Sequence, residues 1–515
     1  MNKRFQIARI AVFIITILLV TLVTAYQISL TPSMIVTSLS VAIIGAVLLL
    51  LLDKLEDCNN AVSLDARIKP DLKTLIVTTF RKKPYVSIYE GDISESEKSK
   101  NSPAQPFMLA PKPLFFMVLV NLLGTIVRVV FLPFQSSDFI SQQLYWHGQF
   151  AGKGLDALSM SVSDYSPLYS TVFALLCQTN LSVQFITKII PATVDFLLAM
   201  TALLIFHEVT DGKSTLRERI IIYGAVLFNP LLILNASCWG QFDSIYTTFI
   251  LLCIYVLIRC IKHRAKYGGD LAMIFLAIAY SIKFQTIFIM PITLFIWLVQ
   301  KEKILKISQK IWIPAIYFLT CIPLILKGHP LRELVGFYLS QAKNVDTSLS
   351  TRYPNFYTIV GLFIKDPPSI TATIGIILTV VLLISFYLYL FFKRIKLDAM
   401  LLLKIAVLVI LTMAFFLPYI HDRYAFVGEM IIVILAFLDK NYFVYSATTI
   451  IVTLFEYVRF LLYSNETGSP LDILFALLRL TVIVLIAQDV INRANIDHKK
   501  ALARGGRKRS FGGNK

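Results

Sequence analysis

The sequence predicts an all-α integral membrane protein that crosses the bilayer many times. The chain has 515 residues, of which 57% are hydrophobic, and its mean hydropathy is +0.72. It repeatedly runs for roughly 20 residues without a charge, which is the helix length that matches a hydrocarbon core about 30 Å thick. These runs lack the period-two alternation of barrel strands. We therefore expect about 12–14 transmembrane helices, with interfacial helices in the outer loops.

The candidate spans follow one another from the N-terminus to near the C-terminus. Lys3 and Arg4 precede the first apolar run, which is too long for a signal peptide and lacks a clear small-residue cleavage site, so we expect an uncleaved span. Residues 1–53 would then hold an N-terminal pair of transmembrane helices, and 113–492 the main membrane module. The spans lie near 8–30, 33–52, 113–133, 184–206, 218–235, 244–261, 270–283, 285–300, 311–327, 371–392, 400–418, 424–438, 442–462 and 471–491.

The distribution of positive charge predicts the orientation in the membrane. The formal net charge is +18, but the cations sit in short loops and the tail between apolar spans, which favours the positive-inside pattern over nucleic-acid binding. Both termini are then cytoplasmic, and the Ile-, Lys- and Asn-rich composition favours a bacterial plasma membrane. The stretches that fall together on the cytoplasmic side are 53–112, 208–218, 262–269, 301–310, 393–398 and 492–515.

Four connecting segments are long enough to have a role of their own. Residues 54–112 carry mixed charge and a long polar run, so we expect a cytoplasmic linker, and 493–515 form a basic cytoplasmic tail. The segment 134–170 holds Lys153 as its only Lys or Arg, and 328–370 has few cations for its length. Both of these loops are therefore assigned to the outer, extracytoplasmic face.

Several functional classes lack the motifs they need. No Gly-rich phosphate loop is present, so a site for ATP or a nucleotide sugar is unsupported. The six cysteines are scattered without a CxxC pair, which predicts neither a disulfide framework nor a zinc site. A secondary transporter or lipid flippase stays an alternative, although two related halves are not evident. So does a membrane scaffold that works through the linker and the basic tail.

The first candidate catalytic residue is Asp138, in the first outer loop. It lies just past the end of a predicted span, at the depth of lipid headgroups, where an acid could act on a lipid headgroup. Ser137 can cap a helix that lies in the interface. The alternative is that Asp138 only offsets the dipole of that helix. Asp156 and Asp164 are weaker rivals, deeper in the loop.

A second polar group interrupts two apolar helices at their outer turn. Its members are Trp239, Gly240, Gln241, Asp243 and Ser244. Polar residues at this depth usually line a cavity, so we expect Trp239, Gln241 and Asp243 to bind substrate. The alternative for Asp243 alone is that it caps the following helix.

Cations at two further outer turns favour an anion site. Lys283 and Gln285 lie where one short apolar segment ends and the next begins, and a lysine on the outer side needs an anionic partner. His421, Asp422 and Arg423 lie between two later spans. His421 could be an ordinary boundary histidine, and Arg423 could pair with Asp422. Their coincidence with Lys283 favours a phosphate pocket.

The second outer loop contains a polar and aromatic run suited to a sugar or a lipid headgroup. Its members are Arg352, Tyr353, Asn355 and Tyr357. The signal is weak by itself. It supports a binding site only together with the cations of the neighbouring turns.

Taken in order, an acid in the first outer loop, YSPLY (Tyr165 to Tyr169), WGQFDSIY, IKFQ and HDRY resemble the GT-C glycosyltransferases. The closest likeness is to bacterial relatives of the GPI mannosyltransferases and to the lipid-phosphate-glucose transferases of N-glycan assembly. The resemblance covers about 113–492, and WGQFDSIY followed by IKFQ is its most specific part.

The resemblance implies inverting transfer of a hexose (mannose, glucose or galactose) from a polyprenyl-phosphate carrier. The acceptor would be a cell-surface glycan or glycolipid on the outer face. Asp138 would be the base, and Lys283, His421 and Arg423 would hold the phosphate. Tyr165, Gln285 and Arg352 would contact substrate. Family members often have a second acid beside the first and a Pro in the lysine motif, whereas Phe139 and Phe284 stand here. These departures leave metal dependence open, with a divalent cation as a possible cofactor.

Overall fold

The computed structural model describes residues 111–263, 267–300, 304–343, 348–364, 370–463 and 470–510. The predicted spans at 8–30 and 33–52 and nearly all of the 54–112 linker lie outside this part. The chain divides into two compact units, Met1–Leu30 with Val127–Lys515 and, separately, Thr31–Ile126. Of the second unit, the structure describes the first turns of one helix. The account below concerns the first unit.

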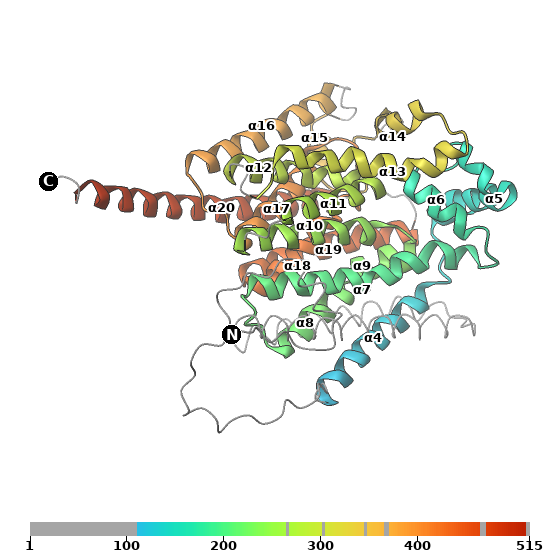
Figure 1. The fold of residues 1–515 in the computed structure, drawn as a ribbon, viewed down its shortest axis with the longest axis horizontal. Helices are drawn as coiled ribbons and strands as arrows, with labels where there is room; N and C mark the ends of the chain where they lie inside the picture. Colours follow the sequence, from blue (N-terminus) through green and yellow to red (C-terminus); the bar gives the residue numbers. More distant parts are fainter. Residues whose placement is uncertain are drawn as a thin grey trace, which may run out of the picture. The chain divides into compact units, whose positions relative to one another are not determined.

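The described residues are almost entirely helical (Figure 1). The α-helices are α4 (Pro111–Phe131), α5 (Leu144–Lys153), α6 (Pro167–Leu176), α7 (Val183–Val209), α8 (Leu216–Leu227), α9 (Pro230–Ile233), α10 (Asp243–His263), α11 (Gly268–Ile282), α12 (Met290–Gln300), α13 (Trp312–Leu326), α14 (Leu331–Lys343), α15 (Phe356–Val360), α16 (Ile370–Phe392), α17 (Ala399–Phe416), α18 (Phe426–Leu438), α19 (Asn441–Tyr463) and α20 (Pro470–Ser510). Short π-helices are η2 (Phe139–Gln143) and η4 (Leu234–Trp239), and 3-10 helices are η3 (Gly154–Ser159), η5 (Phe284–Ile289) and η6 (Ile307–Ile311).

Seven of the described helical segments are long and apolar enough to cross a membrane, and a bent pair makes an eighth. The seven are Val183–Val209, Asp243–His263, Ile307–Leu326, Ile370–Phe392, Ala399–Phe416, Asn441–Leu462 and Leu471–Lys499. Each coincides with a span expected from hydropathy. Four of the five shorter apolar helices also coincide with expected spans, and the fifth, α6, was not expected. The chain is an all-α membrane protein.

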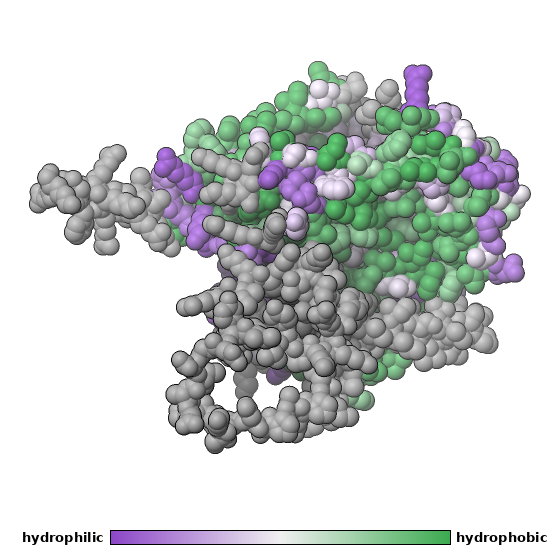
Figure 2. Space-filling model, viewed as in Figure 1, coloured by the Kyte–Doolittle hydropathy of each residue, from purple (hydrophilic) through white to green (hydrophobic). Residues whose placement is uncertain are grey.

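The buried centre of this unit consists of α7, α10, α17 and α18, whose residues are mostly shielded from the surface. The hydrophobic windows of α13 and α16 are only 11% and 22% buried, which leaves their apolar faces outward. Figure 2 shows hydrophobic residues over much of this face and hydrophilic residues toward its two ends, near α5 at one and near α20 at the other. Apolar outer faces are what a helix in contact with lipid requires.

A proline bends the span that leads to the candidate site. α8 and the α9–η4 segment meet at 45°, at Asn229 and Pro230. Proline lacks the N–H of a continuing helix and disfavours helical geometry in the residue before it. The Asn229 Oδ1 accepts a hydrogen bond from the Leu231 backbone N–H at 2.9 Å and so restarts the helix. The chain then runs through η4 to Trp239 and turns at Gly240, whose φ of 79° is the left-handed conformation that glycine adopts readily.

Two other chain breaks complete the frame of the site. Lys283 is extended (φ −151°, ψ 136°) between α11 and η5, so the predicted break between two short apolar helices is confirmed. A two-residue strand, β1 (Ser350–Thr351), pairs in parallel with β2 (Ile420–His421). This pairing joins the predicted second outer loop to the turn between α17 and α18.

Candidate functional site

The segment 134–170, predicted to be the first outer loop, presents Asp138 at the start of η2. The cap of this turn is Ser136, whose Oγ accepts a hydrogen bond from the Phe139 N–H at 3.2 Å, and not Ser137 as expected. The helix that continues as α5 buries Phe139, Trp146 and Phe150. Ile140 and Leu144 of the same segment are exposed.

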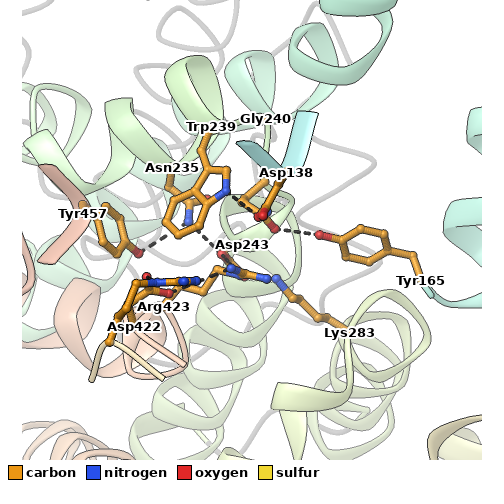
Figure 3. Close-up of polar contacts among 12 residues, drawn as sticks. Asp138, Tyr165, Asn235, Trp239, Gly240, Asp243, Lys283, Asp422, Arg423 and Tyr457 are labelled. Atoms are coloured by element: carbon orange, nitrogen blue, oxygen red, sulfur yellow. Dashed lines mark hydrogen bonds and ion pairs between the residues drawn. The ribbon is translucent and has the colours of Figure 1, made fainter. Parts of the chain in front are cut away.

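The Asp138 carboxylate is held by two side chains, one at the end of η4 and one in the turn that follows it (Figure 3). The indole Nε1 of Trp239 donates a hydrogen bond to Asp138 Oδ2 at 2.7 Å, and Gln241 Nε2 donates to the same oxygen at 3.2 Å. The Tyr165 hydroxyl donates in turn to Gln241 Oε1 at 2.7 Å, which orients that amide. Both bonds to Asp138 use Oδ2, so Oδ1 is the oxygen left to meet a ligand. Asp138 therefore does more than offset a helix dipole.

Asp243 lies at the centre of a second set of contacts. Its carboxylate forms an ion pair with the Lys283 ammonium, and its Oδ2 accepts a hydrogen bond from Asn235 Nδ2 at 2.7 Å. Asp243 is 1% exposed, so removing either partner would leave a buried charge poorly compensated. The chain itself thus supplies an anionic partner for Lys283.

Of Lys283, Arg352 and Arg423, Arg423 has the longest contacts with carboxylates. Its guanidinium lies over the Trp239 ring, 5.0 Å from the centroid, which is a cation–π distance. Its nearest carboxylate oxygens belong to Asp243 and Asp422, each at 3.9 Å, beyond hydrogen-bond length. Within the described residues, the buried Nε of Arg423 has no hydrogen-bond acceptor. Donors of Arg423 are therefore available to an anion.

Arg352 supports the turn that carries Arg423. Its Nε forms an ion pair with Asp422 Oδ2 at 3.1 Å, and its guanidinium stacks on Phe460 at 4.0 Å from the ring centroid. Together with the β1–β2 pairing, this contact fixes the second outer loop against the HDRY turn. Arg352 was expected to contact substrate, and in this structure its charge is directed to Asp422.

The sequence placed His421 with Lys283 and Arg423 among the candidate cations, but its surroundings disfavour the charged form. Burial lowers the pKa of His421 to about 3, and the charges of Arg423, Arg352 and Lys283 act in the same direction. The imidazole is therefore neutral at physiological pH, and can offer a ligand one hydrogen bond rather than a charge. Its ring packs beside that of Tyr424, with the centroids 5.1 Å apart.

The remaining candidates are placed differently. Gln285 lies next to the break at Lys283, and its buried Oε1 has no hydrogen-bond partner among the described residues. Asp156, the rival acid in the first outer loop, is exposed and pairs with Lys327 at 2.7 Å. Ser244 donates to the Pro191 carbonyl at 3.2 Å, inside the helix packing.

Two members of the cluster were not foreseen, Asn235 and Tyr457. Asn235 Nδ2 lies 3.5 Å from the Tyr457 hydroxyl as well as 2.7 Å from Asp243. A lone asparagine inside the apolar run LLILNASCWG was the only signal for the first, and nothing in the sequence marked the second.

In the part of the chain that the structure describes, no group of three His, Cys, Asp or Glu residues could hold a metal ion. No family model matches this chain, and no curated protein sequence matches it. The assignment of a function therefore rests on the motifs and on the geometry just described.

Proposed function

We propose that this protein is a GT-C-type glycosyltransferase that moves a hexose from a polyprenyl-phosphate carrier to a glycan or glycolipid on the outer face of the plasma membrane. The observation that carries the proposal is the double contact of Trp239. The edge of its indole holds the Asp138 carboxylate, and its face holds the Arg423 guanidinium. The proposed base and the proposed anion-binding cation thus contact the edge and the face of one rigid ring.

Asp138 is the proposed general base. As the acceptor hydroxyl attacks the anomeric carbon, its proton passes to Asp138 Oδ1, while Trp239 and Gln241 hold Oδ2. The bond from the anomeric carbon to the phosphate oxygen breaks on the opposite face, and the lipid phosphate leaves with the electron pair. The configuration at the anomeric carbon inverts. Phosphate leaves without an acid, so a single carboxylate is enough.

Arg423 and Lys283 are the proposed phosphate-binding residues. The open donors of Arg423 suit two oxygens of a phosphodiester. Asp243 holds Lys283 close to Arg423, so both cations face the charge that grows on the departing phosphate. Neutral His421 can add a hydrogen bond.

The topology supports a lipid-linked donor. The site residues sit at turns that the charge pattern assigns to the outer side, whereas Lys- and Arg-rich connections lie at the other ends of the same helices. Nucleotide sugars are cytoplasmic, so an outward site requires a donor that crosses the bilayer attached to lipid. A polyprenyl monophosphate sugar is such a donor.

The test is transfer of radiolabelled sugar from a panel of polyprenyl-phosphate sugars to a crude cell-envelope acceptor by the purified protein. Asp138→Asn should lower turnover by about 10²–10⁴-fold, the usual contribution of a general base. Asp156→Asn, in the same loop, is the matched control and should transfer at the wild-type rate. Wild-type turnover in Asp138→Asn would refute the role of this residue.

The same purified protein also tests the main alternative, that it is a lipid flippase. If no donor is consumed but labelled lipid-linked saccharide crosses the bilayer of reconstituted vesicles, the protein is a flippase. The Lys283–Asp243 pair, buried at a helix break, would then belong to a transport site.

A further inference from the structure

Lys188, in the second turn of α7, contacts the backbone just before Asp138. Its side chain is fully buried, and its Nζ donates hydrogen bonds to the backbone carbonyls of Phe131, Leu132 and Phe134 at 3.2, 3.1 and 2.5 Å. The last carbonyls of a helix have no partner within the helix and carry partial negative charge. Lys188 therefore caps the end of α4, and also binds the chain beyond it.

The stem of Lys188 contacts the other half of the site. A Cβ placed on Gly240 would lie 3.5 Å from Lys188 Cγ, so the lysine packs under the left-handed turn between Trp239 and Gln241. Two more bonds join the loops above it. Ser136 Oγ donates to the Trp239 carbonyl at 3.3 Å, and Gln143 Nε2 donates to the Gly240 carbonyl at 3.3 Å.

We propose that Lys188 is a positioning residue that sets the distance between Asp138 and the Trp239–Gln241 pair. One buried ammonium fixes the backbone four residues before Asp138, and its methylene stem fixes the turn that holds the carboxylate. The inference rests on the proposed function for its kinetic consequence, because a displaced base no longer meets the acceptor hydroxyl at the anomeric carbon. The structural consequence does not depend on any reaction.

The structural consequence can be measured by cysteine accessibility. Ser136 is 1% exposed, so Ser136→Cys should resist a membrane-impermeant maleimide in an otherwise native chain. The five described cysteines are buried, and Cys58 is replaced by serine. In Lys188→Met, three backbone carbonyls lose their hydrogen-bond donor. The loop that carries Asp138 then moves away from α7, so Ser136→Cys becomes labelled. Lys188→Arg keeps the donors and should restore protection.

The kinetic consequence is a loss of turnover with little change in substrate binding. Lys188 is fully buried, with its ammonium on backbone carbonyls, and so is out of reach of a donor or an acceptor. Lys188→Met should therefore lower kcat, on the order of 10²-fold for a displacement of about 1 Å, while KM for the lipid-phosphate sugar stays near its wild-type value. Lys188→Arg should recover most of kcat.

Lys404→Met is the matched control. Lys404 is a mostly buried lysine that pairs with Asp439 and Asp489 near the start of α17, at the far end of that helix from His421. This variant should lower the melting temperature without exposing Ser136→Cys. If Lys188→Met is not monodisperse, Lys188→Gln, which is too short to reach all three carbonyls, takes its place.

Protection of Ser136→Cys in both Lys188 variants that lose the ammonium would overturn the proposal. If labelling changes as expected but the wild type transfers no sugar from any donor, Lys188 holds the loop and the proposed function fails. The two failures are thus distinguishable.

Discussion

At the scale of single residues, Trp239 is the side chain on which most of the candidate site depends. It is fully buried, its Nε1 holds Asp138, and Arg423 lies over its ring. These are separate functions of one side chain, because the hydrogen bond needs the indole nitrogen and the cation–π contact needs only the aromatic face. A substitution that removes one and keeps the other can separate them.

Trp239→Phe should therefore lower kcat more than it weakens donor binding. A hydrogen bond to a charged group contributes about 1.5–3 kcal/mol, which corresponds to roughly a 10–100-fold change in rate when it orients the reacting oxygen. Trp146→Phe is the matched control, since the Trp146 ring packs on Tyr165 and Tyr169 and makes no contact with Asp138 that the structure describes. Steady-state kinetics of Trp239→Phe and Trp146→Phe test this prediction. Equal losses would mean that Trp239 acts only through packing.

At the scale of elements, the second outer loop and the turn between α17 and α18 form one structural unit. β1 pairs with β2, and Arg352 reaches Asp422, which is fully buried. Arg352 adopts φ 54°, a left-handed conformation that is uncommon outside glycine, so its position depends on these contacts. The loop is thus part of the support for Arg423.

A double-mutant cycle tests this coupling. Arg352→Met leaves Asp422 buried without its closest cation, and breaking such a pair costs about 3–5 kcal/mol when it is well shielded. Asp422→Asn together with Arg352→Met removes both charges, so the double variant should unfold at a higher temperature than Arg352→Met alone. Lys327→Met breaks the exposed pair with Asp156 and should leave Tm unchanged. Additive losses in the cycle would contradict the coupling.

At the scale of the whole molecule, the proposal requires that the site face outward. Ser137 is exposed beside Asp138, and Lys213 is exposed in the connection between α7 and α8 that the charge pattern places inside. In whole cells with Cys58 replaced by serine, Ser137→Cys should react with an impermeant maleimide. Lys213→Cys should react only after the membrane is permeabilised. The reverse pattern would place the site on the cytoplasmic face and exclude a donor that has crossed the bilayer.

Hydropathy predicted the long helices well, because bilayer thickness sets their length independently of how they pack. It also located the polar turns that contain Trp239, Lys283 and Arg423. Hydropathy could not predict which side chains of these turns pair with each other. Trp239 and Asp138, for example, are 101 residues apart in the chain, and hydropathy carries no information on which turns meet. For the same reason the sequence showed that Lys283 needs an anionic partner but not that Asp243 is one.

The balance of charge at the candidate site bears on competition from ordinary lipids. Its formal charges are three negative and three positive, from Asp138, Asp243, Asp422, Lys283, Arg352 and Arg423. An uncompensated cluster of cations at headgroup depth would attract any anionic phospholipid in the leaflet, and these far outnumber a polyprenyl carrier. In a neutral cluster, an anion gains only from the open donors of Arg423 and must also fit beside a carboxylate. If the proposed function holds, bulk anionic headgroups gain little there, and the cluster stays open for a rare lipid-linked donor.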